Sequence, residues 1–436
     1  MKYLWIAPPL VAILSVVALL TGCGGPSLPV AGSGGPGGSS GGTSTANLVY
    51  GCNWLFESDA QTANIEYPDT NAVYWVAAIP DSIPSGDQIE VASTSATARY
   101  FSFAIYTEDG EAEGSASDAA IFGTASTPAN AVAAGQDYTV SVIYSATAAS
   151  SGNTLVANPN KVSPRAPAHK YLLYRLYLPT SGAADFGNLP VLTYVAASGT
   201  RTSLSSTPDQ ASCNTILNNI NSLLSGGGSS SGSSSSSSSG GLTPAPAVKP
   251  PKMAVYRSSL GLFLNKDSHY MDEKINDTLG DMLIVRGKAP AFATGSQTPQ
   301  VRYWSICSDE FHAPHKTVAC LADKDAQIDT DGYYNVIISV NTPPAGYQST
   351  FDYLPWGADA FGEPIYRQLL ADPSFSQSIA SSSIVLGPAL SMGAYYPGTT
   401  YCSNSVFSSN LSAGAAAVFA ACKNSQGVGA VPDPSN

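Results

Sequence analysis

The sequence predicts an all-β protein made of two tandem β-sandwich or jelly-roll domains, each closed by a short helix. Three observations favour this fold class. Most apolar segments are short and rich in β-branched and aromatic residues, with Gly, Asp and Pro between them, as in strand-rich proteins. A Ser- and Gly-rich segment divides the chain near its middle, and similar motifs recur on both sides of it. We therefore expect two strand-rich domains of similar plan.

The chain begins with the pattern of a bacterial lipoprotein signal peptide. Lys2 is followed by an apolar run over residues 3–20, and small residues lead from there to Cys23. In such leaders cleavage precedes the cysteine, whose thiol then carries diacylglycerol. The sequence therefore predicts a signal peptide over residues 1–22 and a lipid anchor on Cys23.

An uncleaved membrane helix is the alternative, because an apolar run of this length nearly spans a bilayer. Pro8 and Pro9 within the run, and the Gly- and Ser-rich stretch after Cys23, favour the lipoprotein. Residue 24 is Gly rather than Asp, and resemblance to known lipoproteins then implies sorting to the outer membrane. We expect a lipid-anchored protein of the bacterial cell envelope, at the periplasmic face of the outer membrane or at the cell surface.

Two segments of low complexity set the domain boundaries. Residues 23–46 are almost entirely Gly, Ser, Pro, Ala and Thr, which cannot form a packed core, so we expect a flexible tether there. Residues 225–252 join a Gly/Ser run to a Pro-rich stretch, a composition typical of linkers. The sequence thus predicts a first β-sandwich domain over residues 47–224 and a second over residues 253–436, and we expect the two to fold separately.

The cysteines are distributed as disulfides within each domain require. Of the seven cysteines, Cys23 is the lipidation site, and an even number of the others lies on each side of the linker. None has the C-x-x-C spacing of a redox or zinc site, and disulfides are typical of proteins outside the cytoplasm. The second domain allows three connectivities, of which we prefer the most local. The expected bonds are Cys52–Cys213, Cys307–Cys320 and Cys402–Cys422.

Strands are expected where β-branched and aromatic residues cluster. In the first domain these segments are 98–106, 138–144 and 171–178. A helix is predicted at the end of this domain, because apolar residues from Ile216 to Leu224 recur at helical spacing after a Thr-Pro-Asp-Gln start at 207–210. The Ala-rich segment 411–422 is expected to form a second short closing helix.

Short motifs recur in both domains in the same order, which indicates a tandem repeat of one unit. The matched pairs are 99–102 with 302–305, 138–142 with 334–338, and 174–175 with 366–367. Upstream, Asp69 and Tyr74 correspond loosely to Asp267 and Tyr270, although the spacing within the two pairs differs. We therefore expect equivalent strands in the two domains.

Five segments of the second domain carry distinctive motifs. They are 265–270 (Asn-x-Asp-x-x-Tyr), 302–307 (Arg-Tyr-Trp-Ser-x-Cys), 331–334 (Asp-Gly-Tyr-Tyr), 354–357 (Leu-Pro-Trp-Gly) and 365–367 (Ile-Tyr-Arg). With these motifs, most of residues 253–436 resembles secreted bacterial β-sandwich domains of unknown function from envelope proteins, and residues 64–190 do so more weakly. The resemblance implies a β-sandwich fold and transfers no catalytic residue.

Arg99 and Arg302 are candidates for structural ion pairs. On a strand, Arg99 shares one face with two phenylalanines, so its guanidinium is expected to be partly buried. A buried arginine needs a partner, because it keeps its charge. We expect the pairs Asp69–Arg99 and Asp267–Arg302, each within its own domain. The alternative is an arginine that faces a pocket and binds the carboxylate of a ligand.

Residues able to bind a metal cluster in one loop. His312 and His315, with Asp309 and Glu310 before them, lie within the loop that a second-domain disulfide would close. The Pro between the histidines argues against a shared helix face, and a metal needs three or four converging ligands. We expect an exposed loop and no metal or cofactor, the alternative being a transition-metal site at the two histidines.

Asp329–Gly332 resembles part of a calcium-binding loop, but we expect a hairpin turn there.

Some of the numerous aromatic residues are candidates for a sugar- or peptide-binding face. They are Tyr74, Trp75, Tyr353, Trp356, Tyr395 and Tyr396. Packing of these side chains in the sandwich cores is the alternative.

Charge and motifs restrict the function. With 19 Lys and Arg against 31 Asp and Glu, the net charge is −12, the wrong sign for binding nucleic acid. We expect a binding or structural module whose partners are the membrane, through the lipid, and an envelope protein or glycan. The alternative is an envelope hydrolase with its site in the second domain, which holds His269, His312 and His315, although no G-x-S-x-G motif accompanies them.

Overall fold

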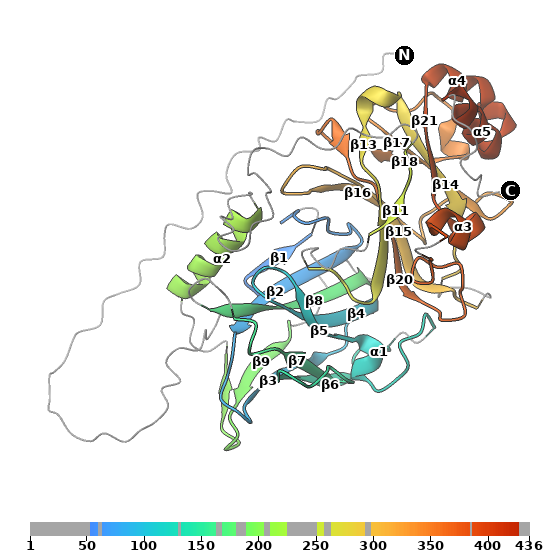
Figure 1. Ribbon diagram of the computed structural model, residues 1–436. Helices are drawn as coiled ribbons and strands as arrows, with labels where there is room; N and C mark the ends of the chain where they lie inside the picture. The colour runs from blue at the N-terminus through green and yellow to red at the C-terminus, as the bar shows by residue number, and fades with distance from the viewer. Residues whose placement is uncertain are drawn as a thin grey trace, which may run out of the picture. The chain divides into compact units, whose positions relative to one another are not determined.

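The computed structural model describes residues 53–59, 63–129, 132–162, 168–179, 189–204, 210–224, 251–256, 263–292, 298–383 and 386–426 (Figure 1). All of them belong to one compact unit, Asn47–Asn436. The predicted signal peptide, the lipidation site Cys23, the tether over residues 23–46 and Cys52 lie outside the described residues, as does most of the predicted linker.

The first half of the chain forms two five-stranded sheets. The strands of its first sheet, in order across the sheet, are β1 (Phe56–Ser58), β2 (Ala72–Pro80), β8 (His169–Pro179), β4 (Ala98–Tyr106) and β5 (Ala112–Ser117). Those of its second sheet are β10 (Arg201–Ser203), β9 (Val191–Val195), β3 (Gln88–Thr94), β6 (Asp137–Tyr144) and β7 (Thr154–Ala157). Within this half β6 and β7 are parallel, and the other paired strands are antiparallel.

The second half has a five-stranded sheet, a four-stranded sheet and a small two-stranded ribbon. The five strands are β11 (Ala254–Val255), β12 (Ser268–Asp272), β20 (Ile365–Ala371), β15 (Val301–Asp309) and β16 (Thr317–Ala322). The four are β18 (Asp352–Pro355), β17 (Tyr333–Ser339), β14 (Met282–Lys288) and β21 (Gly398–Cys402), and the ribbon pairs β13 (Ile275–Asn276) with β19 (Phe361–Gly362). Strands β17 and β18 are parallel, like β6 and β7 in the first half.

The strand orders of the two halves correspond. The order β1-β2-β8-β4-β5 matches β11-β12-β20-β15-β16, and β9-β3-β6-β7 matches β21-β14-β17-β18. The register agrees as well, because Ser102 lies opposite Arg175 in the first half and Ser305 lies opposite Arg367 in the second. The predicted fold class, all-β with two sandwiches in succession, is confirmed.

The two large sheets of each half enclose a hydrophobic core. Phe101 and Phe103 on β4 point into the first core, whereas Tyr100 points to the opposite face of the sheet, as the alternation of a strand requires. On β15, Trp304 lies in the second core and Tyr303 on the opposite face. The faces that carry Tyr100 and Tyr303 belong to one further buried cluster.

The helices are short except for the one that closes the first half. They are α1 (Asp118–Ile121), α2 (Gln210–Leu224), α3 (Pro388–Met392), α4 (Asn404–Asn410) and α5 (Ala415–Ser425), with 3-10 turns η3 (Asp277–Leu279), η4 (Tyr347–Ser349), η5 (Gly393–Tyr395) and η6 (Leu411–Ala413). In α2, Ile216 and Ile220 pack on the outer face of the first sheet, beside Val76 and Leu173, so the predicted closing helix is present. None of the helices in the described part of the chain has the length and hydropathy needed to cross a membrane.

The predicted closing helix of the second half starts later than expected. Residues 411–413 form the turn η6, and Gly414, with a φ of +91°, separates this turn from α5. A left-handed backbone is the conformation that Gly adopts without strain, so it ends the turn before the Ala-rich run begins.

Two of the predicted disulfides are confirmed. Cys307–Cys320 joins β15 to β16, and Cys402–Cys422 joins β21 to α5. Cys213 in α2 is also disulfide-bonded, but its predicted partner, Cys52, lies outside the described residues.

The two halves share a buried interface formed by their first sheets. Tyr100 and Tyr177 of the first half and Tyr303 and Leu369 of the second belong to one buried cluster, in which the rings of Tyr177 and Tyr303 lie 5.4 Å apart. The two sheets are thus in contact in the folded chain, and separate folding of the two domains stays a prediction. The linker's composition indicates a flexible connection, but it does not reveal that the sheets it joins carry apolar outer faces.

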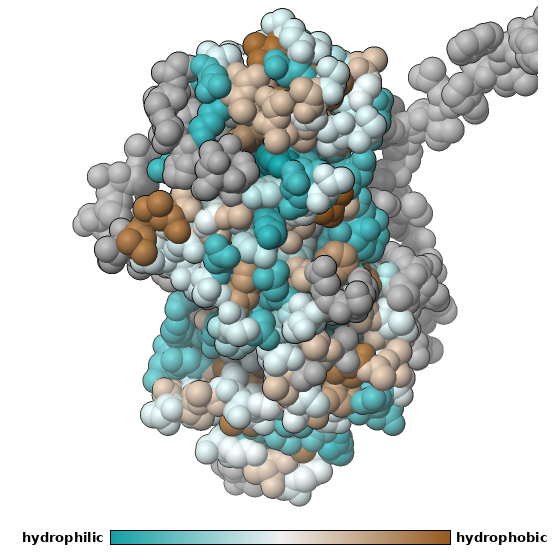
Figure 2. Space-filling view, turned by 90° about the vertical axis from the view of Figure 1, so that its right-hand side faces the viewer, coloured by the Kyte–Doolittle hydropathy of each residue, from teal (hydrophilic) through white to brown (hydrophobic). Residues whose placement is uncertain are grey.

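Figure 2 shows one face of the molecule, on which strongly hydrophobic residues form small separate groups among hydrophilic ones. This face offers no broad apolar surface for docking.

Candidate functional site

Two buried ion pairs cross from one half to the other. Nη1 of Arg99 lies 2.6 Å from the Asp323 carboxylate, and Nη1 of Arg302 lies 2.6 Å from the Asp118 carboxylate. The expected pairs within each domain, Asp69–Arg99 and Asp267–Arg302, are wrong. Asp118 directly follows β5 and Asp323 directly follows β16, so each acid stands at the edge of one sheet and meets an arginine of the other.

Burial dominates the electrostatics of these pairs. Desolvation raises the pKa of Asp118, and it raises the pKa of Asp323 to about 6, in spite of the arginine beside each carboxyl group. A buried pair of this kind adds little net stability, but removing one partner leaves an uncompensated charge. The pairs therefore fix which faces meet.

Asp69 and Asp267 also bind across the interface. Asp69 accepts hydrogen bonds from the Tyr303 hydroxyl at 2.8 Å and from the Ser305 hydroxyl at 2.7 Å. Asp267 accepts one from the Tyr100 hydroxyl at 2.6 Å. The two aspartates are thus interface residues, and each binds the half to which it does not belong.

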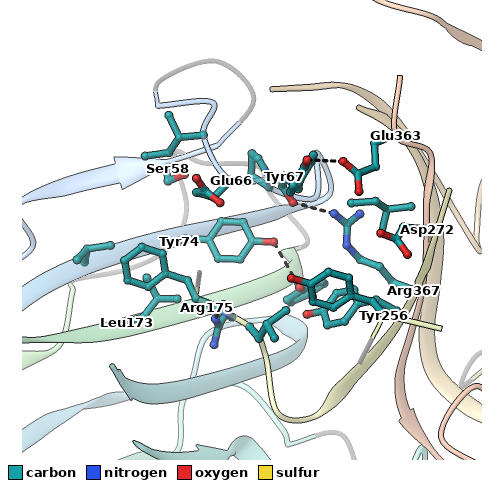
Figure 3. A pocket seen from close by; sticks show the side chains of 18 of the residues that line it. Ser58, Glu66, Tyr67, Tyr74, Leu173, Arg175, Tyr256, Asp272, Glu363 and Arg367 are labelled. Atoms are coloured by element: carbon teal, nitrogen blue, oxygen red, sulfur yellow. Dashed lines mark hydrogen bonds between the residues drawn. The ribbon is translucent and has the colours of Figure 1, made fainter. Parts of the chain in front are cut away.

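The interface contains a pocket of about 150 Å³ (Figure 3). Both halves line it, and its wall is mainly aliphatic and aromatic. The apolar lining includes Phe56, Tyr74, Leu173, Tyr256, Phe263 and Ile365. Its acidic and basic side chains are Glu66, Arg175, Asp272, Glu363 and Arg367, and Tyr67 lies beside them. A concave, mostly apolar pocket with a few polar groups is the usual form of a small-molecule site.

Tyr67 connects the two halves at the pocket's edge. Its hydroxyl donates to Oε2 of Glu363 at 2.6 Å and lies 2.8 Å from Nδ1 of His315. Its carbonyl accepts from Nη2 of Arg367 at 2.7 Å, and its N–H donates to the carbonyl of His315. Tyr67 adopts the left-handed conformation, with a φ of +56°, which turns its backbone toward these partners.

Two carboxyl groups of the pocket, those of Glu66 and Asp272, hold protons more tightly than usual. Burial raises the pKa of Glu66 to about 7. Burial, together with the neighbouring Glu363, raises the pKa of Asp272 to about 7. Burial, followed by Glu363, also raises the pKa of the Tyr67 hydroxyl, and burial lowers the pKa of His315. Near neutral pH the carboxyl groups of Glu66 and Asp272 are therefore only partly charged.

Of the aromatic residues predicted to bind ligand, Tyr74 lines the pocket. Its neighbour Trp75 points the opposite way, into the first core, where it stacks on Tyr174 at 5.6 Å. Trp356 and Tyr396 are buried in the second core. Tyr353 and Tyr395 are half-buried, and neither lines this pocket.

The two histidines considered for a metal face different partners. Nδ1 of His312 lies within hydrogen-bond distance of the Asp359 carboxylate, whereas His315 contacts Tyr67. The potential metal-ligand group found among the described residues is Asp69 with Cys307 and Cys320, whose sulfurs form a disulfide and are therefore not thiolate ligands. The loop around His315 packs on the first half instead of being wholly exposed.

The segment Asp329–Gly332 forms the expected turn. Oδ1 of Asp329 accepts from the backbone N–H groups of Asp331 and Tyr333, and its other oxygen accepts from Nη1 of Arg286 at 2.6 Å. The Asp329 carboxylate thus stabilises the turn and an ion pair with a neighbouring strand.

Sequence reasoning missed most of the pocket. Glu66, Asp272 and Glu363 stand in no motif that marks them as neighbours. The repeated Tyr-Arg dipeptides gave a signal for Arg175 and Arg367, since the same charged residue recurs in the middle of an apolar strand in each half. A charged residue at equivalent positions of two apolar strands indicates that each arginine has polar partners. It does not indicate which segments of the chain provide those partners.

No protein-family model matches the chain, and no curated protein matches it in sequence. Among solved structures, it is similar to an uncharacterized protein from Burkholderia cenocepacia, with 13% identity over 71% of this chain and 76% of that one, at a TM-score of 0.45. A protein from Vibrio parahaemolyticus has 12% identity, coverage of 78% and 90%, and a TM-score of 0.39. A collagen adhesin from S. aureus has 13% identity, coverage of 74% and 82%, and a TM-score of 0.15. Similarities of this size carry no argument about function.

Proposed function

We propose that this chain is a lipid-anchored protein of the bacterial cell envelope that binds a small ligand in the pocket between its two sandwiches. The pocket is the observation that carries the proposal. The anchor rests on the leader pattern that ends at Cys23. The matching strand orders support a tandem repeat and a place among the secreted sandwich domains that the sequence motifs resemble.

The size and lining of the pocket support binding. A largely apolar cavity of about 150 Å³ is large enough for a molecule of the size of benzene. Residues of both halves close it, so a bound ligand would contact both sandwiches and stabilise their interface. Polar groups at its edge would orient the ligand.

Thermal unfolding with small aromatic probes tests the binding function. The full chain, purified in mild detergent, is expected to unfold at a higher temperature in the presence of benzoate or benzamide, because a ligand that binds only the folded state stabilises it. Val76→Phe fills the pocket and should abolish the increase. Val340→Phe is the matched control, since Val340 is exposed outside the pocket. The binding function is disproved if no small aromatic probe raises the midpoint of the wild type.

Metabolic labelling with an alkyne fatty acid tests the anchor. The wild type should incorporate the label and fractionate with the outer membrane, whereas Cys23→Ser should do neither. Incorporation of the label by the Cys23→Ser protein would place the lipid elsewhere or contradict the anchor.

The alternative, an envelope hydrolase, has less support. The Tyr67 hydroxyl, which lines the pocket, lies 2.8 Å from Nδ1 of His315 and donates to Glu363. Burial and Glu363 raise its pKa, whereas an activated nucleophile needs a lowered pKa or a base that removes its proton. The geometry of Tyr67 therefore favours a structural contact at the edge of a binding pocket.

A further inference from the structure

The two halves place an arginine at equivalent positions beside the pocket. Arg175 on β8 lies opposite Ser102, and Arg367 on β20 lies opposite Ser305. Nη2 of Arg175 donates to the carbonyl of Phe263, just as Nη2 of Arg367 donates to the carbonyl of Tyr67. The two environments can therefore be compared atom by atom.

The aspartate of one half has an asparagine as its counterpart in the other. The N–H of Asp69 donates to the Tyr74 hydroxyl, and the N–H of Asn265 donates in the same way to the Tyr270 hydroxyl. Each is five residues before its tyrosine. The equivalence of Asp69 with Asp267 considered from the sequence is therefore wrong by two residues.

Arg367 has a carboxylate beside it. Its Nη1 lies 3.8 Å from Oδ2 of Asp69, and the same nitrogen donates to Sγ of Cys307 at 2.6 Å. The Asp69 carboxylate also accepts from Ser305 and Tyr303. The charge of this buried guanidinium is thus compensated within the chain.

Arg175 lacks both of these partners, and its Nη2 donates instead to the uncharged hydroxyl of Tyr106 at 2.5 Å. Asn265 stands where the first half has Asp69, and Ala104 stands where the second half has Cys307. Nη1 of Arg175 and Nδ2 of Asn265 make no hydrogen bond within the described part of the chain. No described carboxylate forms an ion pair with Arg175, in contrast to Arg367.

A guanidinium in this position is costly. Arg175 is 2% exposed, and arginine keeps its charge under all ordinary conditions. A buried charge without a counter-charge is strongly destabilising unless another group compensates it. Arg175 lines the pocket, so a ligand in the pocket can reach it.

The pocket separates Arg175 from its acidic groups. Figure 3 shows Arg175 on one side and Glu66, Tyr67 and Glu363 on the other, with the ring of Tyr74 between them. A ligand that contacts Arg175 therefore places its remainder against the apolar wall beside it. The wall is formed there by Tyr74 and Leu173 among others.

We propose that Arg175 binds the carboxylate of the ligand, which is a small organic monocarboxylate with an apolar body. This inference rests on the proposed binding function. The chain itself provides the chemical precedent, because a carboxylate, that of Asp69, serves the equivalent arginine of the other half. The volume and apolar lining of the pocket favour a single carboxylate over a larger, more highly charged anion.

Three isosteric probes test this inference with the full chain. Calorimetric titration should show benzoate binding at least tenfold more tightly than benzamide, and benzylamine not binding measurably. Equal affinity for benzoate and benzamide would overturn the carboxylate anchor but leave the binding function intact. Failure of all three probes to bind would instead count against the binding function itself.

A charge-conserving double variant supplies the missing carboxylate. Asn265→Asp combined with Asp267→Asn reproduces the arrangement of Asp69 and Asn71, whose N–H donates to Oδ1 of Asp69. Arg175 should then be compensated within the chain, so the preference for benzoate over benzamide should fall to less than threefold, with benzamide affinity unchanged. Retention of the tenfold preference by the folded variant would overturn the inference. The probe comparison on the wild type decides the matter independently if the variant does not fold.

Discussion

Arg302 of the second sandwich forms its ion pair with Asp118 of the first, and neither side chain is accessible to solvent by more than 2%. The reciprocal pair joins Arg99 of the first sandwich to Asp323 of the second. Each half thus supplies an arginine on a central strand and an aspartate after an edge strand. The two reciprocal ion pairs join the five-stranded sheet that contains β4 to the five-stranded sheet that contains β15. The pocket lies in the interface between these sheets.

Breaking one of these pairs should destabilise the protein strongly. Arg302→Met leaves the buried Asp118 without its partner, and the expected loss in the free energy of unfolding is about 3–5 kcal/mol, measured by urea denaturation. The double variant Arg302→Met with Asp118→Leu should recover much of this loss, because it removes both charges. Arg201→Met, which removes an exposed pair with Glu90, is the control and should change little. A loss below 1 kcal/mol for Arg302→Met would contradict the buried pair.

The two halves should remain associated after the linker is cut. A protease site inserted in the predicted linker, residues 225–252, allows cleavage of the folded chain. We expect both fragments to elute together in size-exclusion chromatography, because apolar and ionic contacts join their sheets. Arg99→Met combined with Arg302→Met should weaken this association. Separation of the wild-type fragments on cleavage would support the independent domains that the linker's composition predicts.

The fold was predictable because its signals are local. The alternation at 98–106 marks a strand, and the periodicity around Ile216 and Ile220 marks a helix, since each pattern depends on neighbouring residues alone. The local disulfide Cys307–Cys320 was predictable for the same reason. The ion-pair partner of Arg99 was not predictable. Several aspartates could provide the counter-charge, and the sequence does not show which of them lies close to Arg99 in the folded protein.

The pocket was hidden from the sequence for a related reason. Its ionisable groups come from separate segments, and they meet only because two sheets dock face to face. The repeat pointed to Arg175 and Arg367 as equivalent residues. The two arginines differ because Asn265 occupies in the second half the position that Asp69 occupies in the first. The hydrogen bonds to Tyr74 and Tyr270 establish that Asp69 and Asn265 are equivalent, and the sequence alone does not.

Stability should fall as the pH rises toward 8, in part through Glu273. Burial raises the pKa of this carboxyl group to about 8, and the Thr399 hydroxyl is its one described hydrogen-bond donor. The folded protein therefore holds this proton more tightly than the unfolded chain. The stabilisation that this bound proton provides is fully present below the ordinary glutamate pKa and is lost as the pH rises through about 8. Between these two pKa values the free energy of unfolding falls by roughly 1.4 kcal/mol per pH unit.

Glu273→Gln isolates this effect, because glutamine does not titrate. The variant should show a shallower decline of the free energy of unfolding between pH 6 and pH 8 than the wild type. Glu111→Gln is the matched control, since Glu111 is exposed and pairs with Lys161 at the surface. Parallel declines in the wild type and Glu273→Gln would show that Glu273 has no raised pKa in the folded protein.

Benzoate binding should weaken as the pH rises from 6 to 8. Glu66 and Asp272 share the pocket, and burial raises the pKa of each to about 7, so both gain negative charge in this range while Arg175 remains positive. Burial lowers the pKa of His315, which disfavours the charged form of its imidazole. Repulsion of the carboxylate by the newly charged groups should reduce the affinity about threefold to tenfold.

Benzamide provides the control for this pH dependence, because it carries no charge and its affinity should stay constant. Glu66→Gln should make the benzoate profile flatter, since one of the two titrating groups is removed and the amide preserves the shape of the side chain. Calorimetric titrations at pH 6, 7 and 8 measure both effects. If benzoate affinity rises with pH, or if benzamide follows the same profile, then the acidic groups do not act on the ligand through its charge.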